Sequence, residues 1–438
     1  MSDFLHQALT REPEGAPHWL HQRHRLGRHQ GGQQALPSRR DEAWKYTSLR
    51  ALEEGGYLAH PEAPPPGSDL GQSFAIADLD AHRLVFVNGR LDASLSGGAS
   101  LPAGVTLVPF SRASTADAAL IHSHLGSLAD GEKQPFVALN DSWLGEGVFL
   151  RVAANTRVTT PIQLVWLTAP QSESFALAQR LLVVLETGSE VAVVEHFAST
   201  AAAQNVFTTG VSELVVGANA RLHHYRLHLE EASALHIGTV HASLARDALL
   251  NGFHLALGSP LKRIDLVVRH RGEGAHCELN GIYLPRRQEQ VDYHTCMEHE
   301  VPHTSSEETF RGIIADRARA VFNGRIHIHR DAQKTSAHLS NRNLLTSNTA
   351  EVDTKPELEI YADDVQCSHG ATVSQLDANQ LYYLLTRGIP RQDALALLSF
   401  GFINEILNRI QHEPLRHHLQ PQLAALFGQD PEFARDFL

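Results

Sequence analysis

Apolar and polar side chains alternate along most of the chain between about Phe136 and Gln375. A clear example begins at Phe322, where Ile326 and Ile328 lie among Arg325, His327 and His329. This period of two predicts β-strands with one buried face and one polar face. Because no helix-length periodic segment interrupts these strands, the pattern disfavours a doubly wound α/β fold.

Tight corners recur within this region at a nearly constant spacing. Corners of Gly, Ala, Asn and Asp at Gly188, Gly217, Asp247 and Gly274 lie 29, 30 and 27 residues apart. Similar corners follow at Asp316 and Asp363, which we interpret as repeats separated by longer insertions. Such spacing indicates one strand–corner–strand unit stacked on the next, a mainly β fold of the β-solenoid or β-helix type. An orthogonal β-sandwich is the second possibility.

Helical patterns flank the repeats on both sides. Residues 1–135 form a helical and mixed region with mobile linkers, and residues 136–375 form the β-helix core. Residues 376–438 form a C-terminal helical domain, in which leucines follow at helical spacing after Asp377. These last helices would cap the open end of the solenoid or present a docking face.

Composition limits the cellular setting and the class of partner. The chain has 438 residues, a net charge of −12 and three cysteines, Cys277, Cys296 and Cys367. So few cysteines, with no basic and apolar leader at the N-terminus, indicate a reduced, cytoplasmic protein. The acidic balance argues against nucleic-acid binding, and the lack of a long apolar run argues against a membrane span.

Most catalytic motifs are absent. The sequence has no GxxxxGK[ST], GxGxxG, CxxC or GxSxG pattern, so nucleotide hydrolysis by this chain is not expected. One HExxH match runs from His299 to His303, but Pro302 opposes the helix that this zinc motif requires. We therefore expect a structural or surface role for both histidines, and a zinc hydrolase that uses them is the alternative.

Cys367 and His369 form the more promising pair. On an extended strand both project to the same face, with Cα atoms roughly 6.6 Å apart. One thiol and one imidazole could share a metal ion or an iron–sulfur cluster if other ligands came from elsewhere. His327 and His329 also share a face, but two solvent-exposed imidazoles on one strand explain them as well as a ligand pair does. Cys277 is expected to be a small buried hydrophobic residue.

An enzymatic alternative rests on carboxylates. Asp316, Asp363 and Asp364 could cluster in a β-helix carbohydrate lyase or hydrolase and act as general acid and base. Enzymes of that kind are usually exported, and no export signal is apparent.

The segment from Phe322 to Asp377, which contains CSHGATV, resembles the SufB/SufD family of the SUF iron–sulfur cluster assembly system. The likeness continues into LYYLLTRGIPRQDALALLSFGFINEIL, and RDEAWKYTSL nearer the N-terminus is also similar to that family. It is strongest toward the SufD branch, although the CxHGAT motif is common to both branches. The resemblance implies a right-handed parallel β-helix between helical N- and C-terminal parts.

The resemblance also implies a function and partners. It implies a non-catalytic scaffold that pairs with SufB and binds the ABC-type ATPase SufC through its C-terminal helices. A nascent iron–sulfur cluster would form at the SufB–SufD interface beside Cys367 and His369, with His369 the stronger candidate ligand. Reduced flavin is a candidate reductant in the complex, no cofactor is expected to bind the isolated chain tightly, and a homodimer is possible in isolation.

Overall fold

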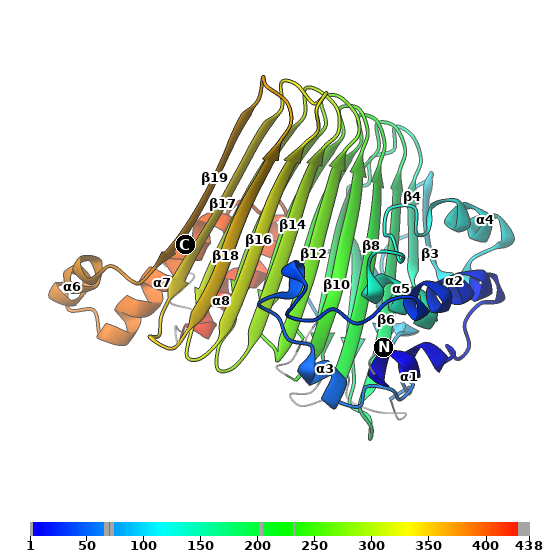
Figure 1. The fold of residues 1–438 in the computed structure, drawn as a ribbon, viewed down its shortest axis with the longest axis horizontal. Coiled ribbons are helices and arrows are strands. Elements are labelled where there is room, and N and C mark those ends of the chain that lie inside the picture. The colour runs from blue at the N-terminus through cyan, green and yellow to red at the C-terminus, as the bar shows by residue number, and fades with distance from the viewer. Residues whose placement is uncertain (1–2, 65–69, 71–73, 201–204, 231–232, 428–438) are drawn as a thin grey trace.

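The computed structural model describes residues 3–64, 70, 74–200, 205–230 and 233–427. Its central part is a parallel β-solenoid of about seven turns, with helices before and after it (Figure 1). The predicted mainly β solenoid is therefore confirmed, and the alternative of an orthogonal sandwich is wrong. None of the described helices is long and apolar enough to cross a membrane.

The N-terminal region contains short helices and three strands. Its α-helices are α1 (Asp3–Thr10), α2 (His21–Gly32), α3 (Arg50–Glu54), α4 (Thr115–His124) and α5 (Pro135–Trp143), with 3₁₀ turns η1 (His18–Leu20), η2 (Glu42–Trp44) and η3 (Phe110–Arg112). Its strands are β1 (His82–Val87), β2 (Arg90–Gly97) and β3 (Val105–Pro109). Asn88 and Gly89, both with positive φ, make the tight turn of the antiparallel β1–β2 hairpin. Strand β1 connects this hairpin to the solenoid by pairing in parallel with the next strand of its sheet.

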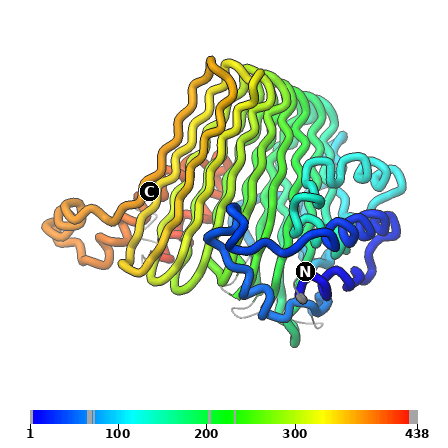
Figure 2. The backbone as a smooth tube through the Cα atoms, viewed as in Figure 1, coloured from blue at the N-terminus to red at the C-terminus, as the bar shows by residue number. Residues whose placement is uncertain are grey.

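The solenoid strands alternate between two sheets, so each turn contributes one strand to each sheet (Figure 2). The first sheet, sheet A, contains β3 and the even strands β4 (Val148–Val152), β6 (Phe175–Leu185), β8 (Val206–Val216), β10 (Leu235–Leu244), β12 (Leu261–His270), β14 (Gln290–His299), β16 (Arg319–Ile328) and β18 (Glu351–Ile360). The second, sheet B, contains β1, β2 and the odd strands β5 (Ile162–Thr168), β7 (Glu190–Ser199), β9 (Arg221–His228), β11 (Leu249–Leu257), β13 (His276–Leu284), β15 (Ser305–Ile314), β17 (Ser336–Leu345) and β19 (Gln366–Ser374).

The interior between the two sheets is filled by inward-facing side chains. Phe310 of sheet B and Phe322 of sheet A, for example, meet with ring centroids 4.9 Å apart, and both are fully buried. The same core extends through every turn, from Phe86 near the N-terminal end to Ala337 and Leu339 near the other. Burial of this apolar column supplies the main driving force for stacking the coils.

The corners from sheet A to sheet B share one backbone device. Each of seven successive corners holds a residue with positive φ: Asn155, Gly188, Asn219, Asp247, Gly274, His303 and Lys334. The backbone N–H of each donates to a carbonyl oxygen in the corner of the next coil, with N–O distances of 2.6–3.1 Å. Gly and Asn adopt this left-handed conformation at little cost, which explains the corner composition seen in the sequence.

The predicted corner series was partly wrong. Gly188, Asp247 and Gly274 are corner residues as expected, with Asn219 rather than Gly217 in the left-handed conformation. Asp316, however, lies between β15 and β16, on the opposite edge of the solenoid from those corners. The series continues instead through His303 and Lys334, so no long insertions interrupt the repeat.

The flanking helices cover the outer faces of the solenoid. Helix α5 packs on sheet A, where Asn140 donates to the Gln179 and Thr209 carbonyls and the buried Arg180 pairs with Asp141 at 2.9 Å. The alternation did not predict α5, which occupies the first residues of the segment assigned to the β-helix core. That assigned boundary at residue 136 stays a prediction.

The three C-terminal helices are confirmed as α6 (Ala378–Thr386), α7 (Arg391–Leu407) and α8 (Glu413–Leu426), but they do not cap the solenoid. Buried residues of α7 and α8 pack on the outer face of sheet B, with Ile403 and Leu415 in one cluster with Phe253 and Leu284. Helix α6 projects past the last coil (Figure 1). The expectation of capping was wrong because the helices carry an apolar face that matches the side of the sheet.

Replacing Asn219 by Val should destabilise the fold by roughly 1–2 kcal/mol, because a β-branched residue is strained at a φ of 57°. Asn219 is exposed, so no lost packing should complicate the measurement. Asn219→Gly, which tolerates the same φ, is the matched control and should lie within about 0.5 kcal/mol of the native chain. Equal denaturation midpoints for the two variants would contradict this account of the corner.

Candidate functional site

Within the part of the chain that the structure describes, the solenoid ends at β18 and β19 without a further coil. Each strand pairs along one side only, β18 with β16 and β19 with β17 in the same sheets, and no described strand pairs with their other edges. An open edge offers unpaired N–H and C=O groups to any strand that approaches it. The C-terminal helices leave this edge uncovered, as the position of β19 in Figure 1 shows.

Cys367 and His369 lie on β19, at positions that face the interior in every earlier coil. Cys367 aligns with Ala337, Ser306 and Cys277 of the preceding strands, all of which are buried. His369 aligns with the buried Leu339. Because no coil follows, Cys367 is only half-buried and His369 is exposed. The structure thus places both predicted residues on one face of the open edge.

Apolar side chains occupy other interior positions of the same last coil. Ile360 aligns with the buried Ile328 and Val373 with the buried Asn343, yet they are 40% and 49% exposed. Large apolar groups left in water at interior positions mark a surface that another chain could bury.

Chemically, the pair is an incomplete ligand set. Burial raises the pKa of the Cys367 thiol, and a hydrogen bond from the Ala337 backbone only partly offsets that effect. Neither Cys367 nor His369 belongs to a group of three or more converging metal-ligand side chains in the described part of the chain. Two such side chains alone do not complete the coordination of an iron–sulfur cluster.

The HExxH motif has no zinc-binding geometry. His299 is buried at the end of β14, bonds to the Thr304 and Ser306 hydroxyls and stacks on His270 at 4.2 Å. His303 lies in the following corner, exposed and with a φ of 57°. The expected structural role of His299 is confirmed, because strand and corner replace the helix that the zinc motif requires.

The carboxylates of the carbohydrate-enzyme alternative are not brought together. Asp316 lies in the β15–β16 corner, whereas Asp363 and Asp364 lie in the β18–β19 corner on the opposite edge. A ten-residue strand separates the two edges by roughly 30 Å. That predicted cluster is wrong, since a general acid and base must reach one bond.

Two histidine–carboxylate groups were not predicted. In the first, His327 and His329 converge on Glu298, with Nδ1 of His327 at 2.6 Å and Nε2 of His329 at 2.9 Å from the same oxygen. Burial of Glu298 favours its neutral form, but hydrogen bonds and charge from these imidazoles outweigh it and lower the pKa of the carboxyl. Glu298 and His327 are 29 residues apart, one coil length, and that offset is the signal that could have revealed the pair.

The second group, around Glu230, is buried, and the charge of its carboxylate is balanced by a lysine. Glu230 accepts a hydrogen bond from His236 at 2.8 Å, lies 3.7 Å from His228 and pairs with Lys262 at 3.1 Å. All four side chains are buried. Because Lys262 supplies the compensating charge, this group is a structural ion network rather than a metal site.

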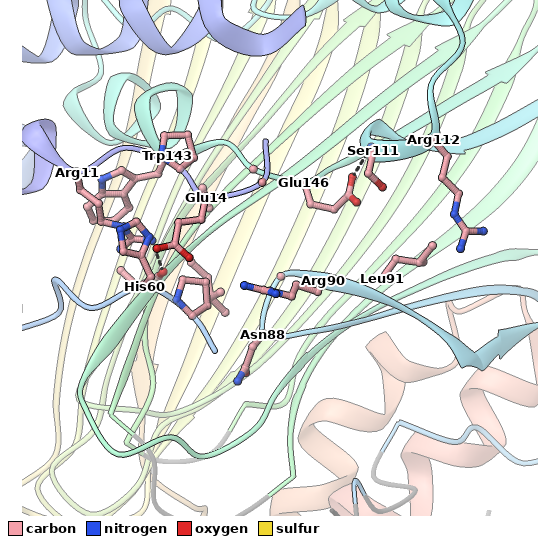
Figure 3. Close-up of a pocket in the computed structure, with 18 residues that line it drawn as sticks. Arg11, Glu14, His60, Asn88, Arg90, Leu91, Ser111, Arg112, Trp143 and Glu146 are labelled. Carbon is pink, nitrogen blue, oxygen red and sulfur yellow. Dashed lines mark hydrogen bonds between the residues drawn. The ribbon is translucent and has the colours of Figure 1, made fainter. Parts of the chain in front are cut away.

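A cleft of about 530 Å³ lies at the other end of the molecule (Figure 3). Arg11, Glu14, His60, Arg90 and Glu146 line it, so charges of both signs face the space. Two of these are already engaged. The Arg11 guanidinium donates to two backbone carbonyls, and Glu146 accepts from the Ser111 backbone N–H. The cleft is remote from Cys367 and presents no defined catalytic arrangement.

Glu308 is buried within the solenoid, in the same column as Leu339 and His369. Neither carboxylate oxygen has a hydrogen-bond partner in the described residues. Burial raises its pKa to about 8, and nearby Thr295 offsets only part of that shift. Glu308 is therefore neutral at pH 7 in the folded protein.

The burial of Glu308 predicts that the stability of the folded chain depends on pH. Between pH 4.5 and 8 the folded chain keeps a proton on Glu308 that the unfolded chain has lost, so stability falls as pH rises. The slope from this group approaches about 1.4 kcal/mol per pH unit. Glu308→Gln should remove that contribution and be more stable than the native chain at pH 8. Urea denaturation of both proteins from pH 5 to 8.5 measures it, and parallel stability curves would contradict it.

The sequence matches two protein-family models and several known proteins. Residues 167–402 match the family model described as SUF system FeS cluster assembly, SufBD core domain, and residues 17–164 match the SufBD protein N-terminal region. The chain is 32% identical to the iron–sulfur cluster assembly protein SufD of Escherichia coli over 97% of this chain and 94% of that protein. It is 31% identical to an iron–sulfur cluster assembly SufBD family protein of Synechocystis over 89% and 87%.

Proposed function

The chain belongs to the SufBD family of iron–sulfur cluster assembly proteins, and from this membership we propose that it is the non-catalytic, SufD-type scaffold subunit of a SUF complex. In this role it pairs with SufB, binds the ATPase SufC, and contributes Cys367 and His369 to the place where a nascent cluster forms. Bond-making steps belong to the partners, and reduced flavin is the candidate electron source.

One observation carries the proposal: two ligand-type side chains occupy interior positions of a coil that no further coil covers. A partner strand added along β18 and β19 would bury Ile360 and Val373 and enclose the space in front of Cys367 and His369. That partner would also supply the missing ligands. A paralogue with the same solenoid is well suited, because its last coil offers edges of matching spacing.

The C-terminal helices suit a mechanical link to the ATPase. Only residues 375–377 separate the end of β19 from α6. Helix α6 has no buried residue and exposes Tyr382 and Tyr383 to 69% and 57%. When SufC binds ATP and closes, a pull on α6 would act directly on the strand that bears Cys367 and His369 and open the interface to iron and sulfide.

His369→Ala should leave the complex with SufB and SufC assembled but lower cluster yield by about tenfold or more, because a ligand is lost. Anaerobic reconstitution of the co-purified complex, followed by iron and sulfide quantification, measures the yield. His338→Ala is the matched control, since this imidazole lies on the neighbouring strand but faces outward beside Ser368. An unchanged yield for His369→Ala, or an equal loss for His338→Ala, would remove His369 from the site.

Replacing both Tyr382 and Tyr383 by Ala should weaken SufC binding by about 30-fold or more, as expected when exposed aromatic anchors are lost. Pairing with SufB should be unchanged, because that contact is assigned to the strand edges. Leu101→Ala, which truncates an exposed apolar residue of the N-terminal region, is the control. Native SufC affinity in the double variant would assign docking to another surface.

A further inference from the structure

The outer face of sheet A carries an arrangement of side chains that the scaffold role does not explain. Glu298 of β14 lies directly beside His327 of β16 in the parallel register, and His329 follows just past the end of β16. One oxygen of Glu298, Oε2, lies 2.6 Å from His327 Nδ1 and 2.9 Å from His329 Nε2. The two imidazole rings are 4.3 Å apart.

These separations, which are hydrogen-bond distances, are slightly shorter than those between the ligands of one metal ion. Bonds of about 2.0–2.2 Å place neighbouring ligand atoms roughly 3.0–3.4 Å apart in octahedral or tetrahedral geometry. The three ligand atoms of Glu298, His327 and His329 all lie within 4.8 Å of one another. A divalent ion could therefore bind among these atoms after side-chain rotations that widen the separations, with each hydrogen-bonding imidazole proton lost to solvent or moved to the other ring nitrogen.

Neighbouring groups hold the carboxylate in position for such an ion. The other Glu298 oxygen, Oε1, accepts a hydrogen bond from the Cys296 thiol at 3.3 Å and lies 3.5 Å from Arg325. Arg325 is in turn 3.6 Å from Glu359. The two carboxylates, Glu298 and Glu359, outnumber the single guanidinium of Arg325 between them, so their summed charge favours a cation. Such outer contacts orient ligands in known metal sites.

The surroundings also separate this group from an ordinary surface ion pair. The Glu298 and His327 side chains are each 18% exposed, and only His329, at 42%, is open to water. Tyr361 packs edge-on against His327, with ring centroids 5.7 Å apart. One side of the group is thus enclosed by protein, and the other is accessible to an incoming ion.

We propose that Glu298, His327 and His329 bind a divalent first-row transition-metal ion. Two imidazoles and one carboxylate suit Zn²⁺ and Fe²⁺, and three protein ligands leave coordination positions open. The site lies at the same edge of the solenoid as the corner that leads to Cys367, since Lys334 of the β16–β17 corner bonds to Asp364 of the β18–β19 corner. Nothing in this proposal depends on the scaffold function.

Titration of the metal-free full chain with Zn²⁺, and with Fe²⁺ under anaerobic conditions, tests the site. Because the chain has 28 histidines, the decisive quantity is the difference between variants. We expect one equivalent in the native chain to bind at least about tenfold more tightly than in Glu298→Gln, His327→Ala or His329→Ala. Zn²⁺ should raise the melting temperature of the native chain and leave that of the variants unchanged.

His303→Asn is the matched control, because it removes an exposed imidazole from a neighbouring corner and Asn tolerates the left-handed backbone there. It should retain the tight equivalent. X-ray absorption of the zinc-loaded native chain should show nitrogen and oxygen ligands alone. Equal affinity in the native chain and all three site variants, or sulfur in the first coordination shell, would overturn the proposal.

Discussion

Each coil of this solenoid is completed by the coil that follows it. The next coil supplies backbone partners for the strands, a carbonyl for the left-handed corner residue, and apolar side chains that close the interior. The requirement is satisfied throughout the stack and is unmet at β18 and β19. Interior positions there become a surface, which is why the last coil carries a half-buried thiol, an exposed imidazole and the exposed apolar side chains of Ile360 and Val373.

The helices cover parts of the outer faces of both sheets. The N-terminal helices cover sheet A over its earlier strands, where α5 is held by Asn140 and by the buried Arg180 with its two acidic partners. Helices α7 and α8 cover the outer face of sheet B. Among the described residues, two of the uncovered regions carry candidate ligands: the last coil, and the outer face of sheet A around Glu298 and His327. Membership of the SufBD family supports the proposed role of the first in iron–sulfur cluster assembly, and side-chain geometry marks the second as a metal-binding candidate.

Patterns within short segments of the sequence predicted some elements of the fold and missed others. Period-two alternation and corner composition are properties of short segments, so they predicted the strands and the solenoid. They did not predict α5, because its residues are nearly all buried and lack a helical polar face. Nor did they predict where α7 and α8 pack, since an apolar helix face does not reveal which surface it covers.

The sequence by itself determined the repeating strand–corner architecture, the three C-terminal helices and the pairing of Cys367 with His369 on one strand face. Only the tertiary structure decided which coil lacks a successor and which residues of separate coils are neighbours. Glu298 and His327 meet because two particular corner lengths set the parallel register, whereas Asp316 and Asp363 fall on opposite edges. The physical reason is that alternation specifies a side chain's face, while register depends on the summed length of every intervening corner.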